Sequence, residues 1–319
     1  MNLNLKPGLK FFLIFFIQII LITLFLSDAC YAQEGGGRRM LTYGEFLLYP
    51  RVWVSVLFGI AGGLLLMFVK IKTPLRLLLL AVMFLVFAVL PVFHGVTFFA
   101  KLAPHPSPMC AITKPVIFSL RMNQFVFPAA FAGVLSFIVF LSIIGNKLFC
   151  GWVCPIGALQ EFFHLLPFNQ KKFKPRFSII NSIRAVLLIG FVPLLLAFGF
   201  VVYSYFNPFE LLHWPFGTDF SIIYVWAVAA VTVLLSLFIF RPFCQIACPI
   251  GIITWILEKV SLTKIRLNKE KCNSCMACVK KSPCLAIDAV IEEKPIRPDC
   301  YACGKCIDEC PTNALSFKF

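Results

Sequence analysis

The chain carries the stretch Phe149-Cys150-Gly151-Trp152-Val153-Cys154-Pro155-Ile156-Gly157, and 94 residues later it carries Phe243-Cys244-Gln245-Ile246-Ala247-Cys248-Pro249-Ile250-Gly251. Both stretches follow the pattern Phe-Cys-x3-Cys-Pro-Ile-Gly, and each comes directly after a long apolar segment. A motif that returns in the same setting indicates that the apolar part of the chain consists of two related halves.

The composition is that of a membrane protein. Hydrophobic residues make up 60% of the 319 residues, charged residues make up 13%, and the mean hydropathy is +0.91. These values lie far outside the range of soluble domains. The net charge of +15 would indicate nucleic acid as a partner in a soluble protein. Here the basic residues flank apolar runs, where they set membrane orientation, so we expect lipid and no nucleic acid.

Five apolar segments are each close to the roughly 20 residues that a membrane-spanning helix needs. They cover residues 52–69, 75–98, 126–146, 183–205 and 220–240. Residues 1–32 combine a basic start, an apolar stretch and a small-residue end, which is typical of a signal peptide or of an uncleaved first span. Either option places residues 33–50 outside and the C-terminus inside. Arg76, Arg184 and Arg241 then fall at the inner ends of spans, as the positive-inside rule requires.

The last 48 residues hold eight of the 14 cysteines, most of them at spacings of two or three. The second run, Cys300-x2-Cys303-x2-Cys306-x3-Cys310-Pro311, is the bacterial ferredoxin signature, in which three cysteines hold one [4Fe-4S] cluster and the fourth reaches the other. The first run has five residues between Cys278 and Cys284, where the signature has three, which loosens that one assignment. Zinc sites use paired ligands, and the cytoplasm disfavours disulfides. The predicted ligand sets are Cys272, Cys275, Cys278 and Cys310 for one cluster and Cys300, Cys303, Cys306 and Cys284 for the other.

The duplicated motif supplies four more thiols. Cys-x3-Cys places two thiols on one face of a helix, so Cys150, Cys154, Cys244 and Cys248 are predicted to converge on a further metal or cluster, or to form redox-active dithiols. The alternative is that small buried cysteines and the Pro-Ile-Gly turn merely end each span. Two matched copies beside a ferredoxin tail favour a functional role.

A few polar residues are candidates for quinol chemistry. Glu161 and His164 follow the first motif and could accept protons from a quinol at the inner interface, although a surface role is the simpler interpretation. His94 and His213 lie toward the outer side, where they could bind quinone.

The order of spans, the Cys-Gly-Trp-Val-Cys-Pro stretch, the second Cys-x3-Cys-Pro and the ferredoxin tail resemble the polyferredoxin-like membrane proteins of the NapH, NosR and CcoG group, over about residues 126–319. This resemblance implies a quinol-linked electron donor to periplasmic respiratory reductases, or a copper-reducing assembly factor in another branch. Only residues 33–50 and short loops are expected outside, where the nitrous-oxide branch has a long flavin-bearing domain. The resemblance therefore favours the NapH-type quinol dehydrogenase subunit.

The predicted fold is a membrane α-helical bundle of five spans, plus a signal peptide or sixth span, with a small α+β two-cluster ferredoxin domain at the C-terminus. The predicted domains are residues 1–32, a transmembrane domain at 33–261 and a cytoplasmic domain at 262–319. In function, we expect a protein of the bacterial inner membrane that exchanges electrons between the quinol pool and a respiratory redox protein. The alternatives are a copper-binding assembly factor, with the metal at the four motif cysteines, and a cluster-based redox sensor.

Overall fold

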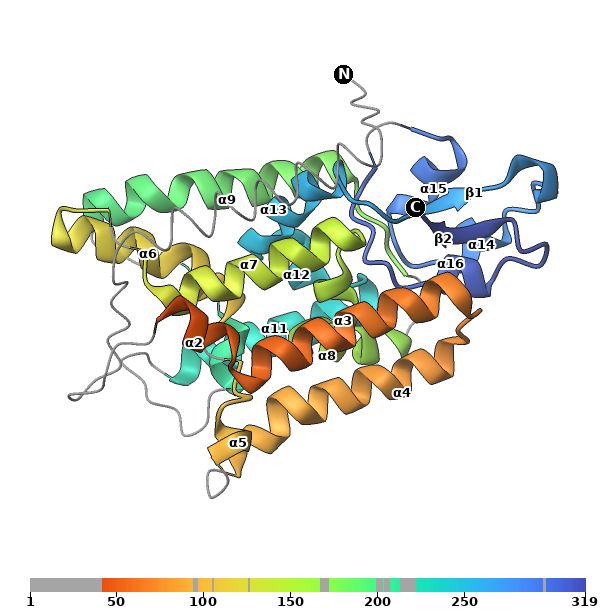
Figure 1. Cartoon of the computed structure of the whole chain (residues 1–319). Helices are drawn as coiled ribbons and strands as arrows, with labels where there is room; N and C mark the ends of the chain where they lie inside the picture. Colours follow the sequence, from red (N-terminus) through yellow and green to blue (C-terminus); the bar gives the residue numbers. More distant parts are fainter. Residues whose placement is uncertain are drawn as a thin grey trace.

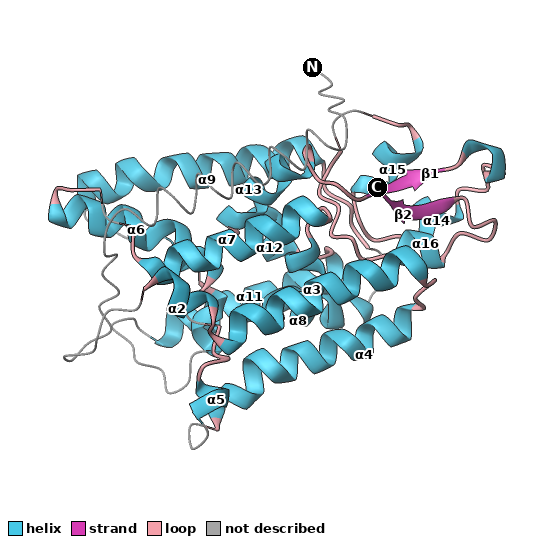
Figure 2. Ribbon diagram, in the orientation of Figure 1, coloured by secondary structure: helices cyan, strands magenta, loops and turns pink. Residues whose placement is uncertain are grey.

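A computed structural model of the chain shows an elongated helical bundle with a small two-stranded unit at one end (Figures 1 and 2). It describes residues 42–93, 97–104, 106–125, 127–166, 172–198, 203, 207–212, 222–294 and 297–319. The predictions for residues 1–32, His94 and His213 lie outside these described residues.

The bundle is built from α-helices and from shorter π- and 3-10-helical elements. In chain order they are α2 (Tyr43–Leu47), α3 (Pro50–Phe68), α4 (Thr73–Phe84), η1 (Leu85–Val89), η2 (Leu90–Val92), α5 (Thr97–Ala100), α6 (Pro108–Met122), α7 (Ala129–Ile144), η3 (Phe149–Val153), α8 (Pro155–Leu165), α9 (Phe177–Phe198), η4 (Pro208–Leu212), α11 (Ile222–Phe238), α12 (Pro242–Ile246) and α13 (Pro249–Glu258).

Among the described residues, three helical segments are long and apolar enough to cross a membrane, namely Pro50–Phe68, Thr73–Val92 and Phe177–Ala197. The predicted spans at 126–146 and 220–240 correspond to α7 and α11, which are apolar but have only 16 and 17 residues. Large apolar side chains such as Leu64 and Ile189 stand on the exterior. This exterior suits lipid rather than water, and the chain is membrane-associated.

Helix α6 occupies a region to which the sequence assigned no element. Ser107 caps its first turn, because its Oγ accepts a hydrogen bond of 3.2 Å from the backbone N–H of Cys110. The helix contains Pro115, which obscures the pattern in the sequence. Cys110 is buried, and its side chain forms no disulfide.

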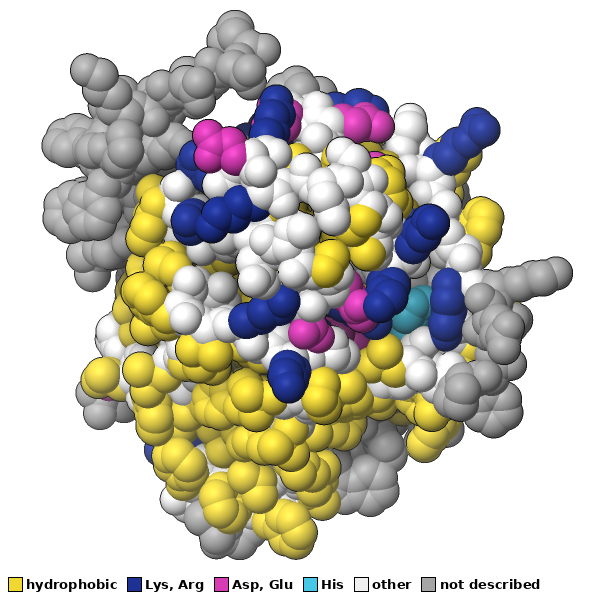
Figure 3. Space-filling view, turned by 90° about the vertical axis from the view of Figure 1, so that its right-hand side faces the viewer, with side chains coloured by type: hydrophobic (Ala, Val, Ile, Leu, Met, Phe, Trp, Pro, Cys, Tyr) yellow, Lys and Arg dark blue, Asp and Glu magenta, His cyan; other side chains and the backbone are white. Residues whose placement is uncertain are grey.

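The C-terminal segment forms a small α+β unit. Strand β1 (Lys264–Leu267) pairs antiparallel with β2 (Leu315–Lys318), and the ribbon buries Ile265 and Phe317. Between the strands lie η5 (Lys269–Lys271), α14 (Ala277–Lys281), α15 (Ala286–Ile291) and α16 (Lys305–Asp308). Viewed from this end, the unit carries side chains of both charges, above a mainly hydrophobic surface of the bundle (Figure 3).

The turn between α3 and α4 holds this unit against the bundle. Lys70 Nζ donates hydrogen bonds to the carbonyl of Cys310 at 3.2 Å and to Asn313 Oδ1 at 2.9 Å. Asp308 Oδ2 accepts hydrogen bonds from the backbone N–H and the hydroxyl of Thr73, at 2.9 and 2.7 Å. A carboxylate at the N-terminus of α4 satisfies a free helix N–H and suits the helix dipole. The turn and the tail therefore lie on the same end of the molecule.

Candidate functional site

Each copy of the repeated motif breaks its helix at the second cysteine. Cys150 lies in the π-helical turn η3, and Cys154 is extended, with φ −66° and ψ 116°. Cys244 lies in α12, and Cys248 is extended in the same way, with φ −73° and ψ 118°. Each extended cysteine precedes the first proline of the next helix, and proline disfavours helical geometry in the residue before it. The prediction that the two thiols of a copy share one face of one helix was therefore wrong.

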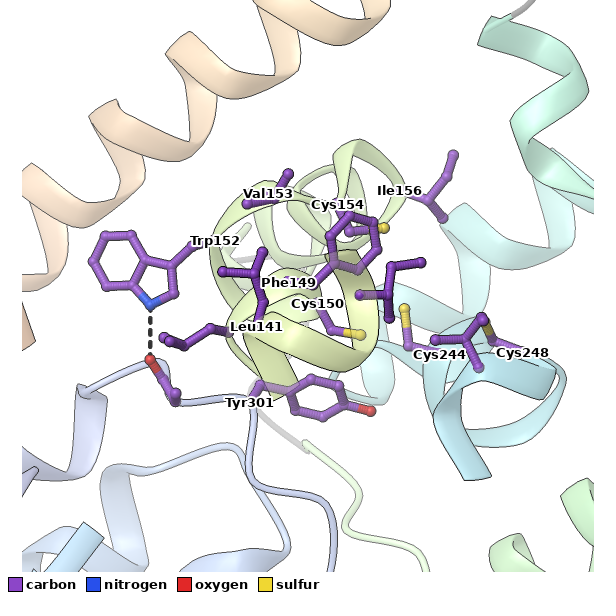
Figure 4. Close-up of a cluster of buried hydrophobic side chains, with 14 of the residues drawn as sticks. Leu141, Phe149, Cys150, Trp152, Val153, Cys154, Ile156, Cys244, Cys248 and Tyr301 are labelled. Atoms are coloured by element: carbon purple, nitrogen blue, oxygen red, sulfur yellow. Dashed lines mark hydrogen bonds between the residues drawn. The ribbon is translucent and has the colours of Figure 1, made fainter. Parts of the chain in front are cut away.

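The four thiols nevertheless meet. Cys150, Cys154, Cys244 and Cys248 line a single buried cavity that is otherwise apolar apart from the ring of Tyr301 (Figure 4). Each cysteine is less than a tenth exposed. The two halves of the chain thus contribute equally to one site.

The halves also exchange contacts around this cavity. Lys147 and Arg241 occupy the same position in the two copies, two residues before the motif phenylalanine. Lys147 Nζ donates to the carbonyl of Gly251 at 2.8 Å, and Arg241 donates to the carbonyl of Cys150. Gln160 Nε2, from the first half, donates to Cys244 Sγ at 3.3 Å. These reciprocal bonds tie the two motif copies to each other.

Two buried ion-pair groups surround the site. Glu161 pairs with Arg76 and with Arg241, the second pair at 2.5 Å. Asp299 pairs with Lys147 at 2.5 Å and with Arg184 at 2.7 Å. Four cations therefore share two carboxylates, and Glu258 is the one further buried acid among the described residues of the site. At least one positive charge is left over. A group bound by four thiolates is anionic, so the charge of the surroundings fits it.

These side chains correct part of the sequence interpretation. Arg76, Arg184 and Arg241 were expected at the membrane surface as orientation signals, and Glu161 at a surface or interface. All four are buried and ion-paired. Helix α9 begins at Phe177, so that Arg184 lies two turns inside it rather than at its start.

His164 is also buried rather than superficial. Its Nδ1 lies 3.0 Å from the carbonyl of Ser236, and its ring packs edge-on against Phe240. This contact gives His164 a structural place between α8 and α11, whereas the ion pairs of Glu161 connect α8 with Arg76 of α4 and with Arg241 before α12.

The cluster loop of the tail packs directly on the first motif copy. The backbone carbonyl of Tyr301 lies where a Cβ on Gly151 would stand, so only glycine fits there. Trp152 Nε1 donates a hydrogen bond of 2.9 Å to the carbonyl of Ala302. The second copy has Gln245 at the position of Gly151. The difference between the copies thus reflects which one receives the tail.

The tail cysteines lie in two neighbouring parts of the C-terminal unit. Cys272, Cys275, Cys278 and Cys310 line one pocket. Cys284, Cys300, Cys303 and Cys306 lie close enough to influence one another electrostatically. Burial raises the pKa of the Cys284 thiol. Since iron binds thiolates, loading this group would release protons.

Within the described residues, no three His, Cys, Asp or Glu side chains lie at the distances of a single-ion site. The cysteine groups instead surround pockets.

Comparison with known proteins identifies the group to which the chain belongs. The family described as "4Fe-4S binding domain" matches twice, over residues 126–175 and 222–268, and each match contains one copy of the repeated motif. "Ferredoxin-type protein NapH" of Escherichia coli is 27% identical over 62% of this chain and 71% of its own length. An uncharacterized protein of Methanocaldococcus jannaschii is 30% identical over 58% of this chain and 77% of its own length. The chain belongs to the NapH-like group of polyferredoxins.

Another relative of this NapH-like chain is "Putative electron transport protein YccM" of Escherichia coli, which is 30% identical over 60% of this chain. The chain spans little more than half of that protein, 56% of its length. No solved structure matches the chain. The family matches indicate [4Fe-4S] binding, and the relatives are ferredoxin-type and electron transport proteins.

The sequence reasoning did not single out Asp299, Tyr301 or Gln160. Asp299 and Tyr301 flank Cys300, so proximity to a cluster ligand was the available signal. Gln160 lies five residues after the motif proline of the first copy, where nothing in the sequence points to Cys244.

Proposed function

We propose that this chain is a membrane electron-transfer protein that holds three [4Fe-4S] clusters and exchanges electrons between a quinol and a redox protein partner. The observation that carries the proposal is the contact between the four-thiol cavity and the tail loop that begins at Cys300, because it joins the two kinds of cysteine site.

Two of the clusters would be held by the tail. Cys272, Cys275, Cys278 and Cys310 would bind one, and Cys300, Cys303, Cys306 and Cys284 the other. Cys275 is exposed, so the first of these sites lies at the surface, where a protein partner can reach it. The second lies beside the bundle.

The third would lie at Cys150, Cys154, Cys244 and Cys248. Support comes from their shared cavity, from the surplus of buried positive charge around it and from the family matches over both motif copies. The clusters supply one-electron chemistry, and the protein holds them in a fixed order from the bundle to the surface.

A quinol could bind in a pocket next to the third site. An apolar pocket lined by Phe87 and Phe137 also contains the buried polar residues Arg51 and Ser55. It shares Phe149 with the four-thiol cavity. Apolar walls with few polar groups are typical of sites for small organic ligands.

We further propose how the chain is arranged in the membrane. The five spans, the inner membrane and a cytoplasmic tail follow from the predicted outside start, and the three described helices that are long enough to cross a membrane support a membrane location. The contact of Lys70 with the tail supports one common side for the α3–α4 turn and the tail.

A quinol analogue tests this function directly. Oxidised protein, purified anaerobically in detergent, should lose visible cluster absorbance when duroquinol is added and regain it with duroquinone. Ser55→Leu, which fills the apolar pocket, should slow the exchange at least tenfold. Leu57→Ala, on the exposed face of the same helix, should not. Clusters that dithionite reduces but that no quinol or quinone affects would contradict the proposal.

A further inference from the structure

Tyr301 belongs to the tail, but its side chain points toward the bundle. In sequence it lies between Cys300 and Cys303, in the loop assigned to a tail cluster. Its side chain lines the cavity of the four bundle thiols rather than the tail pocket (Figure 4). It is about 1% exposed.

The hydroxyl of Tyr301 has no hydrogen-bond partner, although it is fully buried. Buried polar groups are almost always hydrogen-bonded, because leaving one unpaired is costly. Each such group in a native structure therefore calls for a partner. The cavity that Tyr301 lines contains the four thiols and otherwise apolar side chains. Sulfur atoms of a bound group are the acceptors that this cavity would offer.

The ring cannot easily turn the hydroxyl elsewhere. The guanidinium of Arg241 lies 5.1 Å from the ring centroid and the ammonium of Lys147 lies 5.5 Å from it. Phe240 packs edge-on at 6.0 Å. Both cations are fixed by their own bonds to the motif copies. The orientation of the phenol is thus set by the same residues that assemble the four-thiol site.

We propose that Tyr301 donates a hydrogen bond to a sulfur atom of the metal group held by Cys150, Cys154, Cys244 and Cys248, and so raises its reduction potential. This inference rests on the proposed function, because it requires that the four thiols hold a redox-active group. A hydrogen bond to sulfur stabilises the reduced form, which carries one more negative charge. The tail thereby tunes the group to which it passes electrons or from which it receives them.

The test replaces only the hydroxyl. In Tyr301→Phe we expect unchanged iron content and a lower midpoint for the signal that is lost in Cys150→Ala. The expected change is about tenfold in the ratio of reduced to oxidised group at a fixed potential, which is about 59 mV for a one-electron couple. The measurement is an anaerobic redox titration followed by electron paramagnetic resonance. Tyr43→Phe is the matched control, since its hydroxyl is bonded to Ser136 at 2.8 Å, on another part of the fold.

The possible results distinguish the hydrogen bond of Tyr301 from the existence of the third site. An unchanged midpoint with unchanged iron in Tyr301→Phe overturns the hydrogen bond and leaves the proposed function standing. If wild type and Cys150→Ala contain the same iron and show the same signals, the third site itself is refuted, and this inference falls with it. A shift in Tyr301→Phe that is absent in Tyr43→Phe supports both.

Discussion

Asp299→Asn should destabilise the junction between tail and bundle by about 3–5 kcal/mol, because removing one partner of a buried ion pair leaves a buried charge uncompensated. The carboxylate of Asp299 pairs with Lys147 and Arg184, and all three side chains are at most 1% exposed. Asparagine keeps the shape of the side chain but not its charge. The expected result is loss of visible cluster absorbance at a clearly lower temperature than in the wild type.

The matched control for this variant is a surface pair in the same unit. Glu293 pairs with Lys269 at 2.8 Å, but both side chains are at least half exposed. Exposed pairs contribute roughly 0–1 kcal/mol, so Glu293→Gln should melt almost like the wild type. Equal behaviour of the Asp299 and Glu293 variants would show that the buried pairs do not hold the tail.

Cys306→Ala should remove at least about four irons per chain, the content of one [4Fe-4S] cluster. Cys306 is buried among the tail thiols, in electrostatic range of Cys284, Cys300 and Cys303. The tail has a small apolar core, so a cluster acts as its internal cross-link, and its loss should also unfold the surrounding loops. Iron analysis gives the first effect, and limited proteolysis of the tail gives the second.

Cys110→Ala provides the comparison for that loss. Cys110 is buried, as Cys306 is, but it lies in α6, outside the three cysteine groups. Its replacement should leave the iron content unchanged. Full iron content in the Cys306 variant would contradict the assignment of Cys306 as a ligand.

The features that could be predicted from the sequence depend on residues that are close together in the chain. Within each tail run the first three cysteines are separated by two residues, so a short loop can bring them together, and Cys310 of the second run lines the same pocket as Cys272. Apolar runs predicted helices at the positions of α3, α4 and α9, because period and length are local properties.

Contacts between residues that are far apart in the chain could not be predicted from the sequence. Trp152 and Ala302 are 150 positions apart, and Lys147 and Asp299 are 152 apart, so no pattern in the sequence links them. Arg184 and Arg241 were interpreted as surface charges, because the acids that pair with them lie in other segments of the chain. The helix break at Cys154 was missed because the spacing of the thiols was weighed more heavily than the effect of the following proline.

The most direct test of the account is the iron content of the anaerobically purified chain, measured beside the double variant Cys150→Ala, Cys244→Ala. Three clusters predict about twelve irons in the wild type and about eight in the double variant, with one set of resonance signals lost. The tail signals should persist in both proteins. About eight irons in each, with identical spectra, would contradict the third site and with it the continuous series of clusters from bundle to tail.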